Sequence, residues 1–270
     1  MSFFPHDALQ FHYQRSGQGI PFIFQHGLGG DLSQPVGIFT PPQGIELLSF
    51  DFRAHGETRP LGNPDNLSFA SFADDLKAFM DQMKLERAVV GGISMGAGVA
   101  LNFGLRFPER VLGLVLSRAA WLDGAAPQNV KIFMNVSQAI GQHGAKRGLE
   151  PFKFSDAYRE VLQESPDVAA SLLKQFESPR AEETYLRLGR MPKDAPSYDR
   201  REWKSIQVPT LVLANRQDPI HPYEYGEVIA QHIPGAELRE ITSKSVSVAR
   251  HEKETQTFVQ DFLQRHFLQS

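Results

Sequence analysis

The 270-residue chain contains no cysteine. Disulfide bonds, a thiolate nucleophile and cysteine-bound zinc are therefore excluded. The sequence also lacks a basic amino-terminal region followed by a long apolar run, so we expect no signal peptide. No stretch approaches the roughly 18 consecutive apolar residues that a membrane-spanning helix needs. These absences favour a cytoplasmic protein that works away from the membrane.

Neither sign of charge dominates the sequence. There are 28 Lys and Arg residues against 31 Asp and Glu residues, which gives a net charge of −3. A chain without a basic excess offers no reason to expect nucleic acid or an anionic membrane as partner. We therefore expect a small-molecule ligand or substrate, and whether the chain forms a homo-oligomer is left open.

Segments with the pattern of strands and helices alternate through the first 120 residues. Short apolar or alternating runs predict strands, and apolar residues at helical spacing predict helices. This order is typical of the α/β class, with a doubly wound, mostly parallel sheet and helices on both faces. The predicted strands are 8–14, 21–27, 45–52, 87–94 and 111–117, and the predicted helices are 68–83 and 95–108.

The alternation resumes near the end of the chain, after a stretch that has only helical patterns. Residues 209–215 and 236–242 have the pattern of strands, and residues 223–233 and 248–267 have the pattern of helices. Residues 121–205 lack any strand pattern. We therefore predict an α/β core made of residues 1–120 and 206–270, with residues 121–205 inserted as a helical cap.

A serine lies between glycines in the segment GGISMGAG, residues 91–98. Gly92, Ser94 and Gly96 form the pattern G-x-S-x-G between a predicted buried strand and a predicted helix. A serine hydroxyl must project from a sharp turn to reach both a substrate and a base, so its neighbours two residues away must be small. The pattern favours Ser94 as a nucleophile, and the alternative is a turn that only packs small residues.

With this motif the chain resembles the α/β-hydrolase family over almost its whole length. The resemblance implies a serine hydrolase of the carboxylesterase type, but its motifs say little about the substrate. The matching segments are QHGLGG (25–30), DFRAHGET (51–58), GGISMGAG (91–98), LANRQDPIHP (213–222) and FVQDFL (258–263).

The resemblance also implies an oxyanion hole, which needs two backbone N–H groups near the carbonyl oxygen of the substrate. Its donors would be the amides of Leu28 and Met95; the alternative is a plain glycine turn. His26 would shape the loop rather than act as the base. We assign His26, Gly27 and Trp121 to the surroundings of the substrate.

The segment from Asp51 to Gly56 is expected to be scaffolding. Alanine at position 54 replaces a glycine of the family pattern, so we expect no positive φ there.

Asp218 is the predicted catalytic acid, because in this family the acid usually follows the strand after the cap. A carboxylate is needed there to fix the tautomer of the catalytic histidine and to stabilise its cation. Asp218 precedes Pro219, so a role in an Asx turn is the alternative. Asp123 is the second candidate for the acid.

The base is predicted by elimination, since the triad order in this fold is Ser, Asp, His. His221 is too close to Asp218 to come from another loop, and His232 and His266 lie far from the carboxyl edge of the sheet. His251 remains, although it stands three residues beyond the usual position, which Val248 occupies.

Two explanations reconcile His251 with a catalytic role. Either the loop before the last helix is longer, or the helix begins early and the imidazole moves by about 4.5 Å along its axis. The alternative is a surface histidine in a protein that has lost its base.

The sequence therefore predicts hydrolysis of an ester or related acyl bond, with Ser94 attacking, His251 moving the proton and Asp218 orienting His251. No metal or organic cofactor is needed. No cluster of Arg or Lys stands out in residues 121–205, so we expect a small, largely uncharged substrate. Hydrolysis of a lactone, a C–C bond, a thioester or a peptide remains open, as does a non-catalytic ligand-binding role. The resemblance predicts no epoxide or haloalkane cleavage, because those branches of the family have aspartate in place of Ser94.

Overall fold

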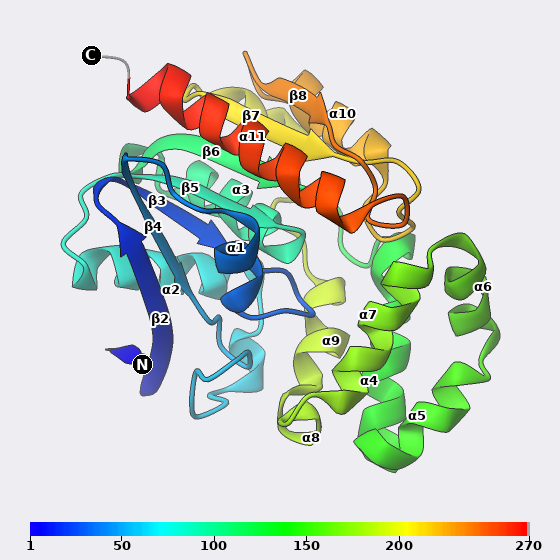
Figure 1. Cartoon of the computed structure of the whole chain (residues 1–270). Coiled ribbons are helices and arrows are strands. Elements are labelled where there is room, and N and C mark those ends of the chain that lie inside the picture. Colours follow the sequence, from blue (N-terminus) through cyan, green and yellow to red (C-terminus); the bar gives the residue numbers. More distant parts are fainter. Residues whose placement is uncertain (269–270) are drawn as a thin grey trace.

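An eight-stranded sheet forms the centre of the computed structural model, which describes residues 1–268 (Figure 1). Its strand order is β1-β2-β4-β3-β5-β6-β7-β8, and only the pairs β1–β2 and β2–β4 are antiparallel. The predicted mostly parallel sheet is confirmed, but β1 was not predicted, because its short SFFPH sequence contains a proline and pairs only at the sheet edge. The strands are β1 (Ser2–His6), β2 (Leu9–Gly17), β3 (Gly19–Gln25), β4 (Gly44–Phe50), β5 (Ala88–Ile93), β6 (Val111–Ser117), β7 (Thr210–Ala214) and β8 (Glu237–Glu240).

Helices connect the parallel strands and fill the long interval between β6 and β7. None of the helices within residues 1–268 has the length and apolar content required to cross a bilayer. The α-helices are α1 (Ser33–Ile38), α2 (Phe69–Gln82), α3 (Met95–Arg106), α4 (Lys131–His143), α5 (Ala145–Lys153), α6 (Asp156–Glu164), α7 (Pro166–Glu177), α8 (Ala181–Thr184), α9 (Leu186–Arg190), α10 (Tyr223–His232) and α11 (Val248–Phe267). Short 3-10 helices are η1 (Pro64–Asn66), η2 (Pro108–Arg110), η3 (Gln128–Val130), η4 (Met191–Lys193) and η5 (Arg200–Ser205).

Two apolar layers hold the helices on opposite faces of the sheet. On one face α11 buries Val259, Phe262 and Leu263 beside α1, and on the other α2, α3 and α10 pack together. Helix α2 begins as predicted, because the Ser68 hydroxyl accepts a hydrogen bond from the Ser71 amide. Its fully buried side chains include Phe69, and each such side chain contributes about 1.5–3 kcal/mol by leaving water.

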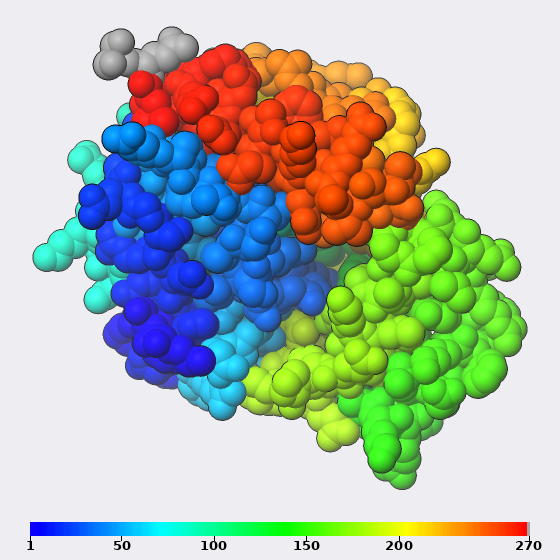
Figure 2. Space-filling model, in the orientation of Figure 1, coloured from blue at the N-terminus to red at the C-terminus, as the bar shows by residue number. Residues whose placement is uncertain are grey.

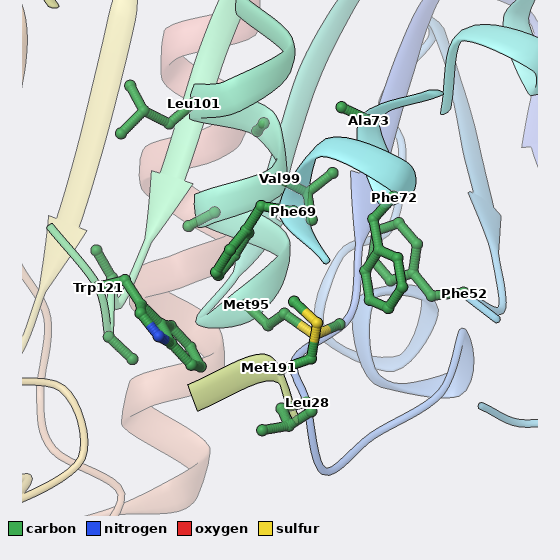
Figure 3. Close-up of a cluster of buried hydrophobic side chains, with 14 of the residues drawn as sticks. Leu28, Phe52, Phe69, Phe72, Ala73, Met95, Val99, Leu101, Trp121 and Met191 are labelled. Atoms are coloured by element: carbon green, nitrogen blue, oxygen red, sulfur yellow. The ribbon is translucent and has the colours of Figure 1, made fainter. Parts of the chain in front are cut away.

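The helices α4–α9 of residues 121–205, called the helical segment below, lie beside the carboxyl ends of the strands (Figure 1). Gln175 Nε2 donates to the Gly29 carbonyl at 3.0 Å, and Arg187 Nε donates to the Leu28 carbonyl at 3.3 Å. Figure 3 shows Met191 of this segment packed near Leu28 and Met95. The helical segment is thus fastened to the loop that follows β3.

Candidate active site

Ser94 sits on a tight turn between β5 and α3. Its φ is 58° and its ψ is −112°, a strained conformation for a residue with a side chain. A Cβ on Gly92 would overlap the Gly96 backbone, and a Cβ on Gly96 would lie 2.6 Å from the Gln25 carbonyl oxygen. Both glycines are therefore required by close backbone contacts, and the G-x-S-x-G spacing has a steric cause.

The two amides expected to form the oxyanion hole lie on either side of this turn. Met95 is the first residue of α3, so its N–H is one of the four amides that a helix start leaves without an internal acceptor. Leu28 follows β3, and its carbonyl accepts hydrogen bonds from His55 Nε2 at 3.0 Å and from Arg187 Nε at 3.3 Å. These bonds hold the Leu28–Gly29 peptide, and His26 Nδ1 contacts the carbonyl of the Gly27–Leu28 peptide, which carries the Leu28 N–H, at 2.9 Å.

Asp218 forms a buried network that includes two residues not assigned from the sequence. Its Oδ2 accepts from Arg118 Nη2 at 2.5 Å and from His221 Nδ1 at 2.9 Å. Its Oδ1 accepts from the amides of Ile220 and His221, so the Asx-turn interpretation also holds. Burial raises the pKa of Asp218, but His221 and Arg118 outweigh burial and lower the carboxyl pKa well below its usual range. The carboxylate is therefore ionised at neutral pH.

His221 was expected to be too close to Asp218 to come from another loop, and it contacts the acid from the same loop instead. The loop turns at Pro219, and this turn brings the imidazole back onto the carboxylate of Asp218 from the same loop. The side chain of His221 is 11% exposed, and burial lowers its pKa below the ordinary histidine value. Because its pKa is lowered, His221 is a neutral imidazole at neutral pH.

His251 lies in the first turn of α11 and makes no hydrogen bond to Asp218 or Ser94 within residues 1–268. Its Nδ1 instead donates to the Thr242 carbonyl at 2.8 Å. The helix begins at Val248, so of the two explanations offered for the shifted histidine, the early helix start is confirmed. Burial, followed by the charge of Arg118, lowers the pKa of His251 to about 4.

The two histidines line different cavities, which adjoin each other. Ser94, Leu28, His221 and Val248 line a cavity of about 460 Å³, which the helical segment closes with side chains of α4 and α7. His251 instead lines a neighbouring cavity of about 240 Å³. In Figure 2 the green helical segment meets the blue amino-terminal third and the orange start of α11, and all three contribute to the larger cavity.

Val248 thus lines the cavity of Ser94, at the position in the sequence where the resemblance predicts the catalytic histidine. His251 lies one helical turn further along α11, behind that position.

The family model that matches this chain is described as the alpha/beta hydrolase fold, and it matches residues 20–245. The chain belongs to this family. It is 28% identical over 258 residues to the AB hydrolase superfamily protein YisY of Bacillus subtilis, covering 88% of this chain and 89% of that protein. It is 25% identical over 232 residues to 3-oxoadipate enol-lactonase 2 of Acinetobacter baylyi, covering 83% and 81%.

A similar fold is found in the solved structure of a meta-cleavage product hydrolase from Pseudomonas fluorescens. The TM-score is 0.75 at 20% identity, and the match covers 98% of both chains. At this identity the likeness concerns the fold alone.

Of the residues that this α/β hydrolase was expected to place around a substrate, only Gly27 lines the cavity of Ser94. His26 is fully buried, with Nδ1 on the Gly27 carbonyl and Nε2 on the Phe52 amide, so both ring nitrogens hold the backbone. Trp121 is 2% exposed and packs edge-on against Phe69, away from the cavity wall. Neither His26 nor Trp121 therefore lines the cavity of Ser94.

The loop after β4 is scaffolding, as expected, but one detail was wrong. Asp51 accepts hydrogen bonds from the Leu32 and Glu57 amides and contacts His12 Nδ1 at 2.9 Å. Ala54 has φ of 62°, so it adopts the left-handed conformation that its side chain was expected to avoid.

The second candidate for the acid is engaged elsewhere. The Asp123 carboxylate accepts hydrogen bonds from Arg200 Nε at 2.8 Å and from Arg200 Nη2 at 2.6 Å. Asp123 does not line the cavity of Ser94. This bidentate pair lowers the pKa of Asp123 and fixes the start of η5.

Sequence reasoning also missed the cations around the serine. Arg118, Lys174 and Lys244 come from separate parts of the chain and line the same cavity. Only Lys174 belongs to residues 121–205, where no cationic cluster was expected; Arg118 and Lys244 come from the core. Within residues 1–268, no group of three or more His, Asp or Glu side chains is arranged to hold a metal ion.

Proposed function

We propose that this chain is a serine hydrolase of the carboxylesterase type, which cleaves an ester or related acyl bond through an acyl-enzyme on Ser94. The observation that carries the proposal is the strained turn of Ser94 at the wall of a cavity that also receives Leu28 and His221. A cavity of about 460 Å³ suits a small-molecule substrate.

In the proposed mechanism, the Ser94 hydroxyl attacks the carbonyl carbon of the substrate. The amides of Leu28 and Met95 donate to the oxygen as it gains negative charge. A histidine takes the hydroxyl proton and returns it to the leaving group, and then activates the water that releases the acid product.

We propose His221 as this base, in place of His251. If His221 Nδ1 donates to Asp218, as the 2.9 Å contact supports, the free lone pair is on Nε2, where a base needs it. Arg118 Nη2 also lies 3.1 Å from this Nδ1, and in this tautomer the guanidinium donates to Asp218 alone. Asp218 then orients His221 and stabilises its cation. Arg118 shares the same carboxylate oxygen and weakens this stabilisation, which keeps His221 neutral to a lower pH.

His251 is the weaker candidate because it lines the cavity that does not include Ser94. Burial lowers the pKa of both histidines, that of His251 to about 4, so the pKa does not separate the two candidates. The catalytic role of His251 stays a prediction, which the experiment below tests.

A non-catalytic ligand-binding role is the second candidate. It is favoured by Val248 at the usual position of the imidazole and by the ion pair between Arg118 and Asp218, because both weaken a conventional triad. Lactone hydrolysis is the same chemistry on a cyclic ester, and one relative is named an enol-lactonase.

The test is steady-state hydrolysis of p-nitrophenyl acetate and butyrate by the wild type and by the variants Ser94→Ala, His221→Gln and His251→Gln. The two glutamine variants are matched in size and chemistry. We expect Ser94→Ala to be inactive and His221→Gln to lose about 10²–10⁴-fold in kcat. His251→Gln should retain most of its turnover.

A reversed order of the two histidine variants would assign the base to His251. An inactive wild type would support the ligand-binding alternative.

A further inference from the structure

We propose that Arg118 and Lys244 form a subsite for the carboxylate of an anionic substrate, whose acyl bond lies at Ser94. This inference rests on the proposed function and replaces the sequence-based expectation of an uncharged substrate. The two cations come from different loops, one after β6 and the other between β8 and α11. Both line the cavity that holds Ser94 and the neighbouring cavity that holds His251.

Arg118 has a buried donor that no acceptor within residues 1–268 satisfies. Its side chain is only 8% exposed, and its φ of 51° marks a sharp turn directly after β6. One Nη2 hydrogen bond goes to Asp218, but the buried Nε has no hydrogen-bond partner within residues 1–268. A buried donor without an acceptor costs about 1–3 kcal/mol, and an anionic ligand would supply that acceptor.

Lys244 adds a second cation without a close counter-ion. No carboxylate lies within 4.0 Å of its ammonium group in residues 1–268, although the side chain is half-buried. Burial, and then the positive charge of Arg118, lowers the pKa of Lys244. The two cations therefore repel each other. A carboxylate placed between them would relieve this repulsion.

The acidic groups nearby offset this pair only in part, because burial and Arg118 have the larger effects on the pKa of Lys244. Asp218 is held by Arg118 and His221. Asp167 lines the larger cavity, but its carboxylate accepts from the hydroxyls of Ser165 and Ser245. Glu252 lines only the smaller cavity.

Arg118 and Lys244 both line the wall between Ser94 and the smaller cavity, and the buried Nε of Arg118 has no acceptor within residues 1–268. A substrate with a carboxylate a few bonds from its acyl group fits this distribution. An ester of the same size without that charge leaves both donors unused.

The experiment compares two p-nitrophenyl esters of similar length, the hemiester of glutaric acid and the neutral ester of pentanoic acid. We expect the wild type to favour the anionic ester by about tenfold or more in kcat/KM, mostly through a lower KM, because a charged hydrogen bond contributes that much. Lys244→Met should abolish the preference, and Lys244→Arg should restore most of it. Lys253→Met, which removes an exposed lysine from α11, is the matched control and should leave the preference unchanged.

A second measurement does not need turnover. Glutarate should raise the thermal midpoint of the wild type and of Lys253→Met, but not that of Lys244→Met. If the neutral ester is hydrolysed as well as the anionic one and glutarate gives no shift, the subsite is refuted while the proposed function stands. If neither ester is hydrolysed but glutarate still shifts the midpoint through Lys244, the proposed function fails and the anion subsite stands.

Discussion

Replacing Gly96 by alanine should damage both stability and catalysis, because a methyl group there meets backbone atoms that cannot rotate away. The added Cβ would lie 2.6 Å from the Gln25 carbonyl oxygen and 2.7 Å from that of His26. Alanine favours a helix over glycine by about 1 kcal/mol. Overpacking of this kind costs about 1–3 kcal/mol or more, so we expect a net loss of about 2 kcal/mol.

The same substitution should reduce turnover more than stability. Relief of the clash must move either α3, which carries the Met95 amide, or the end of β3, which leads to the Leu28 amide. A misplacement of about 1 Å in a catalytic group can cost about 10²-fold in rate.

Gly104→Ala is the matched control in the same helix. Its Cβ would lie 3.2 Å from a methyl group of the Leu114 side chain, which can move, so stability should change by less than about 1 kcal/mol. The assays are urea unfolding and hydrolysis of p-nitrophenyl butyrate. The steric argument is refuted if Gly96→Ala equals Gly104→Ala in both.

Two further predictions concern buried charge. Because burial and a nearby guanidinium lower the pKa of His251 to about 4 while the unfolded chain keeps about 6.5, the unfolded state binds the proton more readily between these values. Stability should therefore fall by about 3 kcal/mol as pH decreases from 6.5 to 4, and His251→Gln should remove most of this dependence in urea unfolding at several pH values. Arg53→Met should cost about 3–5 kcal/mol in the same assay at pH 7, since it strands the fully buried Asp75 carboxylate. Arg201→Met, which breaks an exposed pair, should have no measurable effect, and an equal loss in both arginine variants would contradict the role of burial.

Most of the parallel part of the sheet could be predicted from the sequence because its strands are short apolar runs that are largely buried; β8, with the sequence ELRE, is the exception to this pattern. Helix α11 was predicted with its observed bounds, and its apolar residues recur at helical spacing from Phe258 to Phe267. The edge strand β1 could not be predicted, because a partly exposed strand with a proline has no clear apolar pattern.

The site was predictable only where its chemistry is local in the sequence. Ser94 could be found because its turn requires glycines at fixed spacing. The contact between His221 and Asp218 depends on the path of a single tight loop, and the meeting of Arg118 with Lys244 depends on which strands are neighbours in the sheet. Neither contact has a local pattern, although a histidine three residues after the acid was a signal that could have been weighed.

Mass spectrometry after treatment with a fluorophosphonate probe tests the central claim most directly. The account predicts one covalent adduct, on Ser94, formed by the wild type and by His251→Gln but formed far more slowly by His221→Gln. An unlabelled wild type, or labelling that depends on His251 and not on His221, would contradict it.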